Sequence, residues 1–205
     1  MTRMGLFINP FWTQMNYISK LIQSKKTVFT YKDLEILLWI KNRNTIKSFL
    51  ARYVNSWILE KKYQWIYVLP QYNIFELATK VKKDSYISFE TVLKSEWIIF
   101  QNYWDKIFLA SDKVWSKEIW WYIFEYRKIK DSILHNPLWL IQKWQYAMAC
   151  PERAVCDRLY LSANYYFDNI EHLNFSKLQE ISKIYNKRVI LSVNKLIDDF
   201  KYRKA

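Results

Sequence analysis

Apolar residues recur on a helical period between Thr45 and Asn55. Counted from the first of them, they stand at positions i, i+3, i+4, i+7 and i+8: Ile46, Phe49, Leu50, Tyr53 and Val54. This spacing predicts a helix with one buried side. Its opposite side presents small or basic residues, namely Thr45, Lys47, Ser48, Ala51 and Arg52. Asn44 stands immediately before the helix, where an asparagine side chain commonly caps the first backbone N–H groups.

The segments on both sides of this helix predict a winged helix-turn-helix. Upstream, residues 31–40 predict a second short amphipathic helix, and the polar residues 41–43 provide a turn of the length that a helix-turn-helix needs. Downstream, residues 57–60 and 66–69 are short β-prone runs, which predict a two-stranded hairpin with a basic tip. A solvated helical hairpin inside a larger core is the alternative interpretation of the same pattern.

The remaining segments predict an α+β protein with two domains. Before the helix-turn-helix we expect a helix at 10–23 and a short strand at 27–30 that pairs with the hairpin, with Thr30 capping the next helix. The pattern changes after Pro70, so we place one domain at 1–72 and a mixed α/β domain with a small antiparallel sheet and C-terminal helices at 73–205. In the second domain we expect helices at 74–81, 89–96 (capped by Ser88), from 151 onward, 175–185 and 187–202, antiparallel neighbouring strands at 106–109 and 122–127, and a third strand at 145–149.

Positive charge is concentrated around the predicted helix-turn-helix. The whole chain has a net charge of +13, and between Lys41 and Lys62 there are six basic residues against one acid, Glu60. Such a patch favours the phosphates of nucleic acid. The residues that we expect to contact double-stranded DNA are Lys41, Arg43, Asn44, Thr45, Lys47, Ser48, Arg52, Lys61, Lys62 and Gln64.

Glycine and tryptophan occur in abnormal numbers. Glycine is about 7 % of an average globular chain, yet this chain of 205 residues has one glycine and 11 tryptophans. Several tryptophans stand where a glycine is expected, at helix ends and turns: Trp57, Trp65, Trp97, Trp115, Trp120, Trp121, Trp139 and Trp144. Our hypothesis is that ten of the eleven are UGA codons that the source reads as glycine. The alternative is a genuinely tryptophan-rich protein that binds a sugar or a membrane surface through aromatic platforms.

Catalytic and metal-binding patterns are weak throughout the sequence. His135 and His172 have no cysteine or carboxylate nearby at ligand spacing, and Cys150 and Cys156 suit small apolar fillers. The run from Pro151 to Asp157 suits a helix start, with Glu152 at the positive end of the helix dipole and a pair between Arg153 and Asp157. We therefore expect no enzyme activity, no cofactor and no metal.

The sequence also predicts a cytoplasmic protein without a membrane partner. No segment approaches the roughly 18 uninterrupted apolar residues of a membrane span. The apolar run near the start is shorter than the hydrophobic region of a signal peptide and is ended by Asn9 and Pro10.

Three motifs in this order resemble the AbiEi family: WIYVLP at 65–70, SYISFETVL at 85–93 and ACPERAVCD at 149–157. The resemblance covers roughly residues 10–165, and tryptophan stands at 57, 65, 97, 120, 121 and 144 where the family usually has glycine. Members of this family are antitoxins and transcriptional autoregulators of type IV toxin-antitoxin systems, which act in abortive infection and phage defence.

The resemblance implies a repressor that binds repeats in its own promoter and a C-terminal domain that counteracts a co-encoded nucleotidyltransferase-like toxin, with or without direct contact. A winged-helix transcription regulator whose C-terminal domain senses a ligand or dimerises, without a toxin, is the alternative function.

Overall fold

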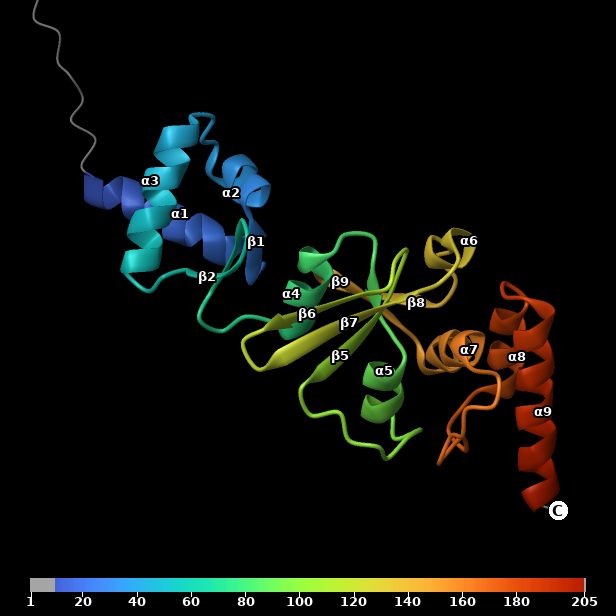
Figure 1. Cartoon of the computed structure of the whole chain (residues 1–205). Helices are drawn as coiled ribbons and strands as arrows, with labels where there is room; N and C mark the ends of the chain where they lie inside the picture. The colour runs from blue at the N-terminus through green and yellow to red at the C-terminus, as the bar shows by residue number, and fades with distance from the viewer. Residues whose placement is uncertain (1–9, 205) are drawn as a thin grey trace, which may run out of the picture. The chain divides into compact units, whose positions relative to one another are not determined.

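The computed structural model describes residues 10–204 and confirms an α+β fold (Figure 1). The chain divides into two compact units, Met1–Lys80 and Val81–Ala205. The domain boundary predicted between residues 72 and 73 lies eight residues before the observed one, which follows Lys80. The first unit contains α1 (Pro10–Gln23), β1 (Val28–Thr30), α2 (Tyr31–Leu38), α3 (Arg43–Asn55), β2 (Glu60–Tyr63), β3 (Ile66–Val68) and α4 (Ile74–Val81), which ends at the boundary.

The core of the first unit gathers the apolar sides of its helices over a small sheet. Leu34 of α2, Ile46 and Tyr53 of α3, and Phe29 of β1 are fully buried in one cluster. The rings of Phe49 and Tyr53 stack with centroids 4.0 Å apart. The buried residues of α3 are the ones that recur at helical spacing in the sequence, so the predicted inward side of α3 is confirmed.

The small sheet has the strand order β1-β3-β2 and is antiparallel. The predicted pairing of residues 27–30 with the hairpin is confirmed, since Val28 lies opposite Val68. The first hairpin strand was predicted wrongly at 57–60. Residues 56–57 close the end of α3 and Leu59 is buried in the core, so the strand begins only at Glu60.

Asp33 ties α2 to its surroundings through one carboxylate. Its Oδ2 accepts hydrogen bonds from the Thr30 backbone (2.9 Å) and hydroxyl (2.7 Å), and the Thr30 hydroxyl accepts from the Asp33 N–H, which forms a capping box. Lys26 and Lys80 lie 3.0 and 3.1 Å from the same carboxylate. Burial alone raises the pKa of Asp33, but the hydrogen bonds from Thr30 and Lys26 and the charge of Lys80 outweigh it and hold the pKa well below its ordinary value.

Acid is therefore expected to destabilise the first unit. A carboxyl whose pKa is lowered by folding stabilises the protein above its unfolded pKa, about 4, and this contribution is lost as the pH falls through the folded pKa. In Asp33→Asn, the free energy of unfolding measured between pH 7 and pH 2 should depend less on pH than in the wild type. The exposed Asp198→Asn variant should keep the wild-type slope, and an unchanged slope in Asp33→Asn would contradict this role.

The second unit is built on a six-stranded mixed sheet with the order β6-β7-β5-β4-β9-β8. Its strands are β4 (Tyr86–Ile87), β5 (Lys106–Ser111), β6 (Trp115–Ile119), β7 (Tyr122–Lys128), β8 (Leu140–Lys143) and β9 (Tyr146–Ala149). The predicted small antiparallel sheet is therefore wrong. β5 and β7 pair in parallel rather than antiparallel, because residues 115–119, which lie between them in the chain, form an extra strand, β6, that pairs antiparallel with β7.

Five helices accompany this sheet: α5 (Glu90–Ser95), α6 (Asp131–Leu134), α7 (Pro151–Leu161), α8 (Phe175–Ser182) and α9 (Lys187–Lys204). Helices α7, α8 and α9 pack against one another, as Figure 1 shows in orange and red. Ser88 does not cap α5 as predicted. Residue Phe89 holds the cap position, and the Ser88 hydroxyl donates instead to Asp157 at 2.6 Å.

A buried charged network joins α7 to the sheet. The Asp157 carboxylate accepts hydrogen bonds from the hydroxyls of Ser88, Tyr86 (3.0 Å) and Tyr185 (2.7 Å). Arg153 donates to the Tyr86 hydroxyl at 3.2 Å and to backbone carbonyls at 133, 136 and 138. The sequence predicted a pair between Arg153 and Asp157. Both residues are 0 % exposed, and they form a buried anchor in which the Tyr86 hydroxyl links the two side chains.

Candidate nucleic-acid interface

Helix α3 begins at Arg43 rather than Thr45. The Asn42 side chain accepts hydrogen bonds from the backbone N–H groups of Asn44 (2.8 Å) and Thr45 (3.2 Å), so Asn42 is the cap and the predicted cap, Asn44, lies in the first turn. The earlier start adds Arg43 to the helix itself. Backbone N–H groups at a helix start favour anions such as phosphate.

The polar side of α3 is exposed to solvent. Ile46, Phe49, Leu50 and Tyr53 are 0–3 % exposed, and the residues between them point outward. Arg52 lies with its guanidinium 5.6 Å from the Tyr53 ring. The predicted contact residues that are exposed on α3 and the preceding turn are Lys41, Arg43, Asn44, Thr45, Lys47, Ser48 and Arg52.

The two neighbouring lysines of the hairpin, Lys61 and Lys62, have different environments, although the sequence predicted the same role for both. Lys61 and Gln64 are exposed. The side chain of Lys62 is only 2 % exposed, and its ammonium lies 2.6 Å from the Glu60 carboxylate and 5.3 Å from the ring centre of Tyr72. Lys62 is therefore less suited than Lys61 to contact phosphate, because its charge is already engaged inside the fold.

A hollow of about 250 Å³ lies between α3 and the hairpin. Lys47 and Asn55 line it from the helix, and Lys61, Trp65 and Tyr67 line it from the hairpin. The fold thus brings together two exposed lysines that are far apart in sequence. Both lysine side chains line the same concave surface, and two neighbouring cations suit the backbone of a duplex better than two isolated ones would.

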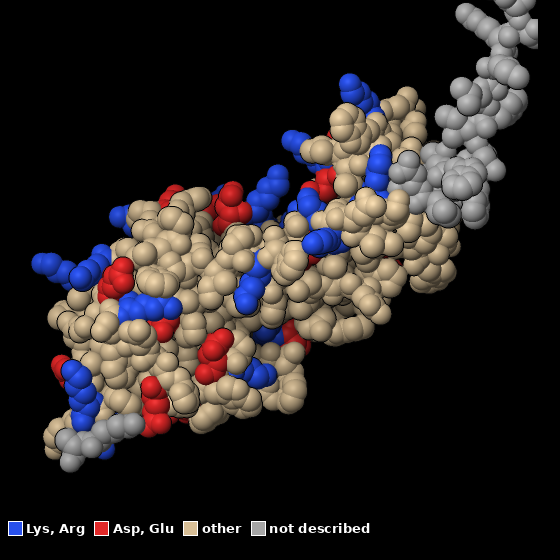
Figure 2. Space-filling model, turned by 180° about the vertical axis from the view of Figure 1, so that it is seen from behind, with Lys and Arg blue, Asp and Glu red and all other residues tan. Residues whose placement is uncertain are grey.

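Positive side chains also occur elsewhere on the protein. Figure 2 shows one face on which blue Lys and Arg side chains project from many places, with red Asp and Glu side chains among them. The net charge of the whole chain therefore does not mark the interface by itself. The candidate interface is defined instead by the hollow that α3 and the hairpin line together.

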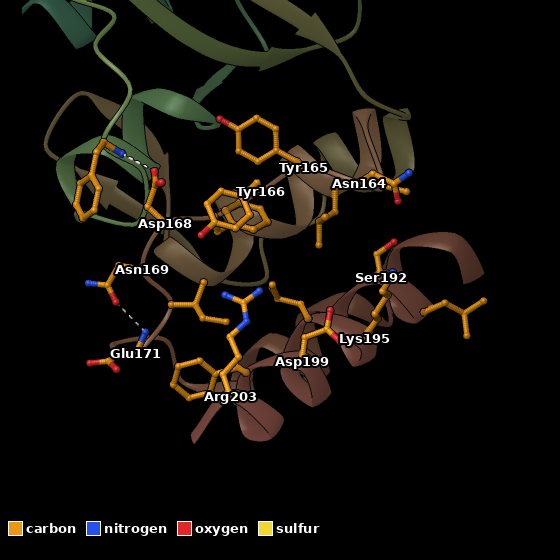
Figure 3. A pocket seen from close by; sticks show the side chains of 18 residues that line it. Asn164, Tyr165, Tyr166, Asp168, Asn169, Glu171, Ser192, Lys195, Asp199 and Arg203 are labelled. Carbon is orange, nitrogen blue, oxygen red and sulfur yellow. Dashed lines mark hydrogen bonds between the residues drawn. The ribbon is translucent and has the colours of Figure 1, made fainter. Parts of the chain in front are cut away.

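A second concave surface lies within the C-terminal unit, between residues 163–171 and α9. Its volume is about 840 Å³, and aromatic rings such as Tyr165, Tyr166 and Phe200 line it together with Lys195 and Arg203. Figure 3 shows the tyrosines opposite the polar side chains of α9. The sequence shows no sign of this pocket, because one wall is an irregular loop without periodicity.

Contacts around this pocket hold its loop in place. The Asp168 carboxylate accepts a hydrogen bond from the Phe100 N–H at 2.8 Å, and the Arg158 guanidinium lies 4.0 Å from the ring centre of Tyr165. Burial raises the pKa of Tyr165 to about 12. The pocket therefore offers aromatic faces, and Lys195 and Arg203 supply hydrogen-bond donors in its lining.

Other candidate chemistry is sparse. His135 and His172 are exposed, and Cys150 and Cys156 are buried, which raises the pKa of both thiols. Across residues 10–204, no group of three or more His, Cys, Asp or Glu side chains could hold a metal ion. Over the same residues, no helix has the length and apolar character to cross a bilayer.

No protein-family model matches the chain, and no curated protein matches it.

Proposed function

We propose that the N-terminal unit is a winged helix-turn-helix that binds double-stranded DNA. Helix α3 enters the major groove with Thr45, Lys47, Ser48 and Arg52, and the β2–β3 hairpin is the wing. The single observation that carries the proposal is the hollow that Lys47 and Lys61 line together. A helix of this length with an exposed basic side matches what the major groove admits.

The particular function is that of an AbiEi-type antitoxin that represses its own operon and counteracts a co-encoded nucleotidyltransferase-like toxin. Support comes from the order of the three sequence motifs. In the structure the second and third motifs meet, because Tyr86 and Ser88 of one donate to Asp157 of the other. The C-terminal unit that these motifs build is distinct from the DNA-binding unit, which allows separate repressor and antitoxin roles.

DNA binding is tested with the full chain and the DNA upstream of its own gene. A gel-shift titration should give a complex that survives an excess of scrambled DNA of the same composition. The affinity should fall steeply with salt, because binding releases counterions from phosphates. Equal affinity for the scrambled DNA, or no complex at all at low salt, would contradict the proposal.

The antitoxin role is tested by co-expression with the reading frame next to the gene. That frame alone should arrest growth, and the full chain should restore growth. Arrest that persists despite full-length protein would contradict the antitoxin role while leaving DNA binding intact.

A ligand-sensing regulator is the second candidate function, and the 840 Å³ pocket favours it. Its volume lies in the range of small-molecule sites. Its aromatic walls, with the cations Lys195 and Arg203 and carboxylates such as Asp199, suit a small aromatic ligand that carries both charges. Phenylalanine is a suitable probe. Saturable binding that is lost in Arg203→Ala and that changes the affinity for operator DNA would support this function, whereas an unchanged affinity for DNA would contradict it.

A further inference from the structure

Within residues 10–204, seven tryptophans have a backbone conformation that ordinarily requires glycine. Their φ angles are positive, from 36° at Trp144 to 60° at Trp65. For a bulky L-residue this left-handed region is a genuine outlier and costs about 1–2 kcal/mol. The seven are Trp39, Trp57, Trp65, Trp97, Trp120, Trp139 and Trp144.

Three of them terminate helices in the same way. At the end of α2, the N–H of Trp39 donates to the carbonyl of Ile36, and the N–H of Ile40 donates to that of Glu35. These two bonds define the Schellman motif, in which the residue after the helix is left-handed and is usually glycine.

The same pair of bonds recurs at Trp57 after α3 and at Trp97 after α5. Trp57 donates to Val54 and Ile58 to Tyr53, while Trp97 donates to Lys94 and Ile98 to Leu93. In all three motifs an isoleucine follows the tryptophan, and an apolar residue at this position commonly accompanies this cap. The hydrogen bonds and the following apolar residue of each motif are therefore present, and only the usual glycine is missing.

The other four lie in tight turns. Trp120 and Trp144 are the first residues of the two-residue loops β6–β7 and β8–β9, a position where positive φ favours glycine. Trp65 is in the loop β2–β3. Trp139 is the third residue of a turn that the Leu140 N–H closes on the Pro137 carbonyl, where positive φ again favours glycine.

The indole rings do not compensate for this strain by burial. The seven side chains are between 41 % and 85 % exposed. Their contacts are at the surface, such as the edge of Trp65 against Tyr31 and the Lys177 ammonium 4.4 Å from the Trp139 ring centre. Nor do they form one aromatic platform, because Trp120 and Trp144 lie in hairpins at opposite edges of the six-stranded sheet.

We infer that the natural protein carries glycine at these seven positions, encoded by UGA codons that its source translates as glycine. The inference is restricted to the positions with positive φ. Trp104, Trp115 and Trp121 do not have positive φ, and the structure does not assign glycine to them. Trp115 in particular lies within β6 and stacks on Tyr126 with ring centres 5.2 Å apart, where an indole contributes packing.

Peptide mass spectrometry of the protein purified from its own source tests the inference directly. Peptides that span residues 39, 57, 65, 97, 120, 139 and 144 should all carry the mass of glycine. Tryptophan at these positions in the native protein would overturn it.

Recombinant variants provide a second, physical test. Each of Trp57→Gly and Trp97→Gly should raise the ratio of folded to unfolded chain about 5-fold to 30-fold, the equivalent of relieving the left-handed strain. Trp115→Gly is the matched control and should lower that ratio, because glycine within a strand loses packing and costs backbone entropy. A neutral or destabilising effect of both helix-end substitutions would contradict the conformational argument.

Discussion

Asp157→Ala is expected to lower the free energy of unfolding of the C-terminal unit by about 3–5 kcal/mol, the cost of breaking a buried charged network. The substitution removes the acceptor of three hydroxyls, those of Tyr86, Ser88 and Tyr185, and leaves them without their carboxylate. It also removes the anion that faces the buried charge of Arg153 through Tyr86. Because a domain of this size is stable by only about 5–15 kcal/mol, the substitution removes a large fraction of the stability of the unit.

Urea denaturation of the full chain, followed by circular dichroism, measures this effect. Asp198→Ala, an exposed aspartate on α9, is the matched control and should change stability by no more than about 0.5 kcal/mol. A variant that does not fold supports the same conclusion, since the loss then equals the whole stability of the unit. If Asp157→Ala matched the control, the network would not be an anchor of this fold.

The sequence predicted the helices best where apolar residues recur at helical spacing along the whole segment. Helices α1 and α4 have the predicted bounds, and the buried residues of α3 are those at helical spacing. The start of α3 was missed because Asn42 and Asn44 are both suitable caps, and only the geometry shows that Asn42 accepts the bonds. The pattern of apolar residues thus predicts that a helix exists, but it does not determine which of two nearby asparagines caps it.

Long-range partners explain most of the remaining errors. Strand β4 has two residues and both are buried, so it has no alternation to detect, yet it lies at the centre of the sheet between β5 and β9. Lys62 looked like Lys61 in the sequence, and only the fold places its ammonium against Glu60 and Tyr72. The pattern of charges therefore predicts where cations are, and the packing decides which of them remain exposed.

The combined variant Lys47→Ala, Arg52→Ala is expected to abolish selective binding to the upstream DNA. An arginine that makes paired hydrogen bonds to a guanine contributes about 1–3 kcal/mol of discrimination, and Lys47 supplies one of the two cations of the hollow beside the hairpin. Both side chains lie on the exposed side of α3, so their removal leaves the buried core unchanged. Fluorescence anisotropy should show at least a tenfold loss of affinity for the upstream DNA, with a smaller loss for scrambled DNA.

The neighbouring lysines of the hairpin provide a matched pair for the same measurement. Lys61→Ala should weaken binding to both DNAs about equally and reduce the slope of log affinity against log salt by about 1, as expected for one phosphate contact. Lys62→Ala removes the same charge one residue away, but this ammonium is held by Glu60 inside the fold, so affinity and salt slope should stay near wild type. If the two lysines had equal effects, or if the combined α3 variant still selected the upstream DNA, the duplex would not contact the surface formed by α3 and the hairpin.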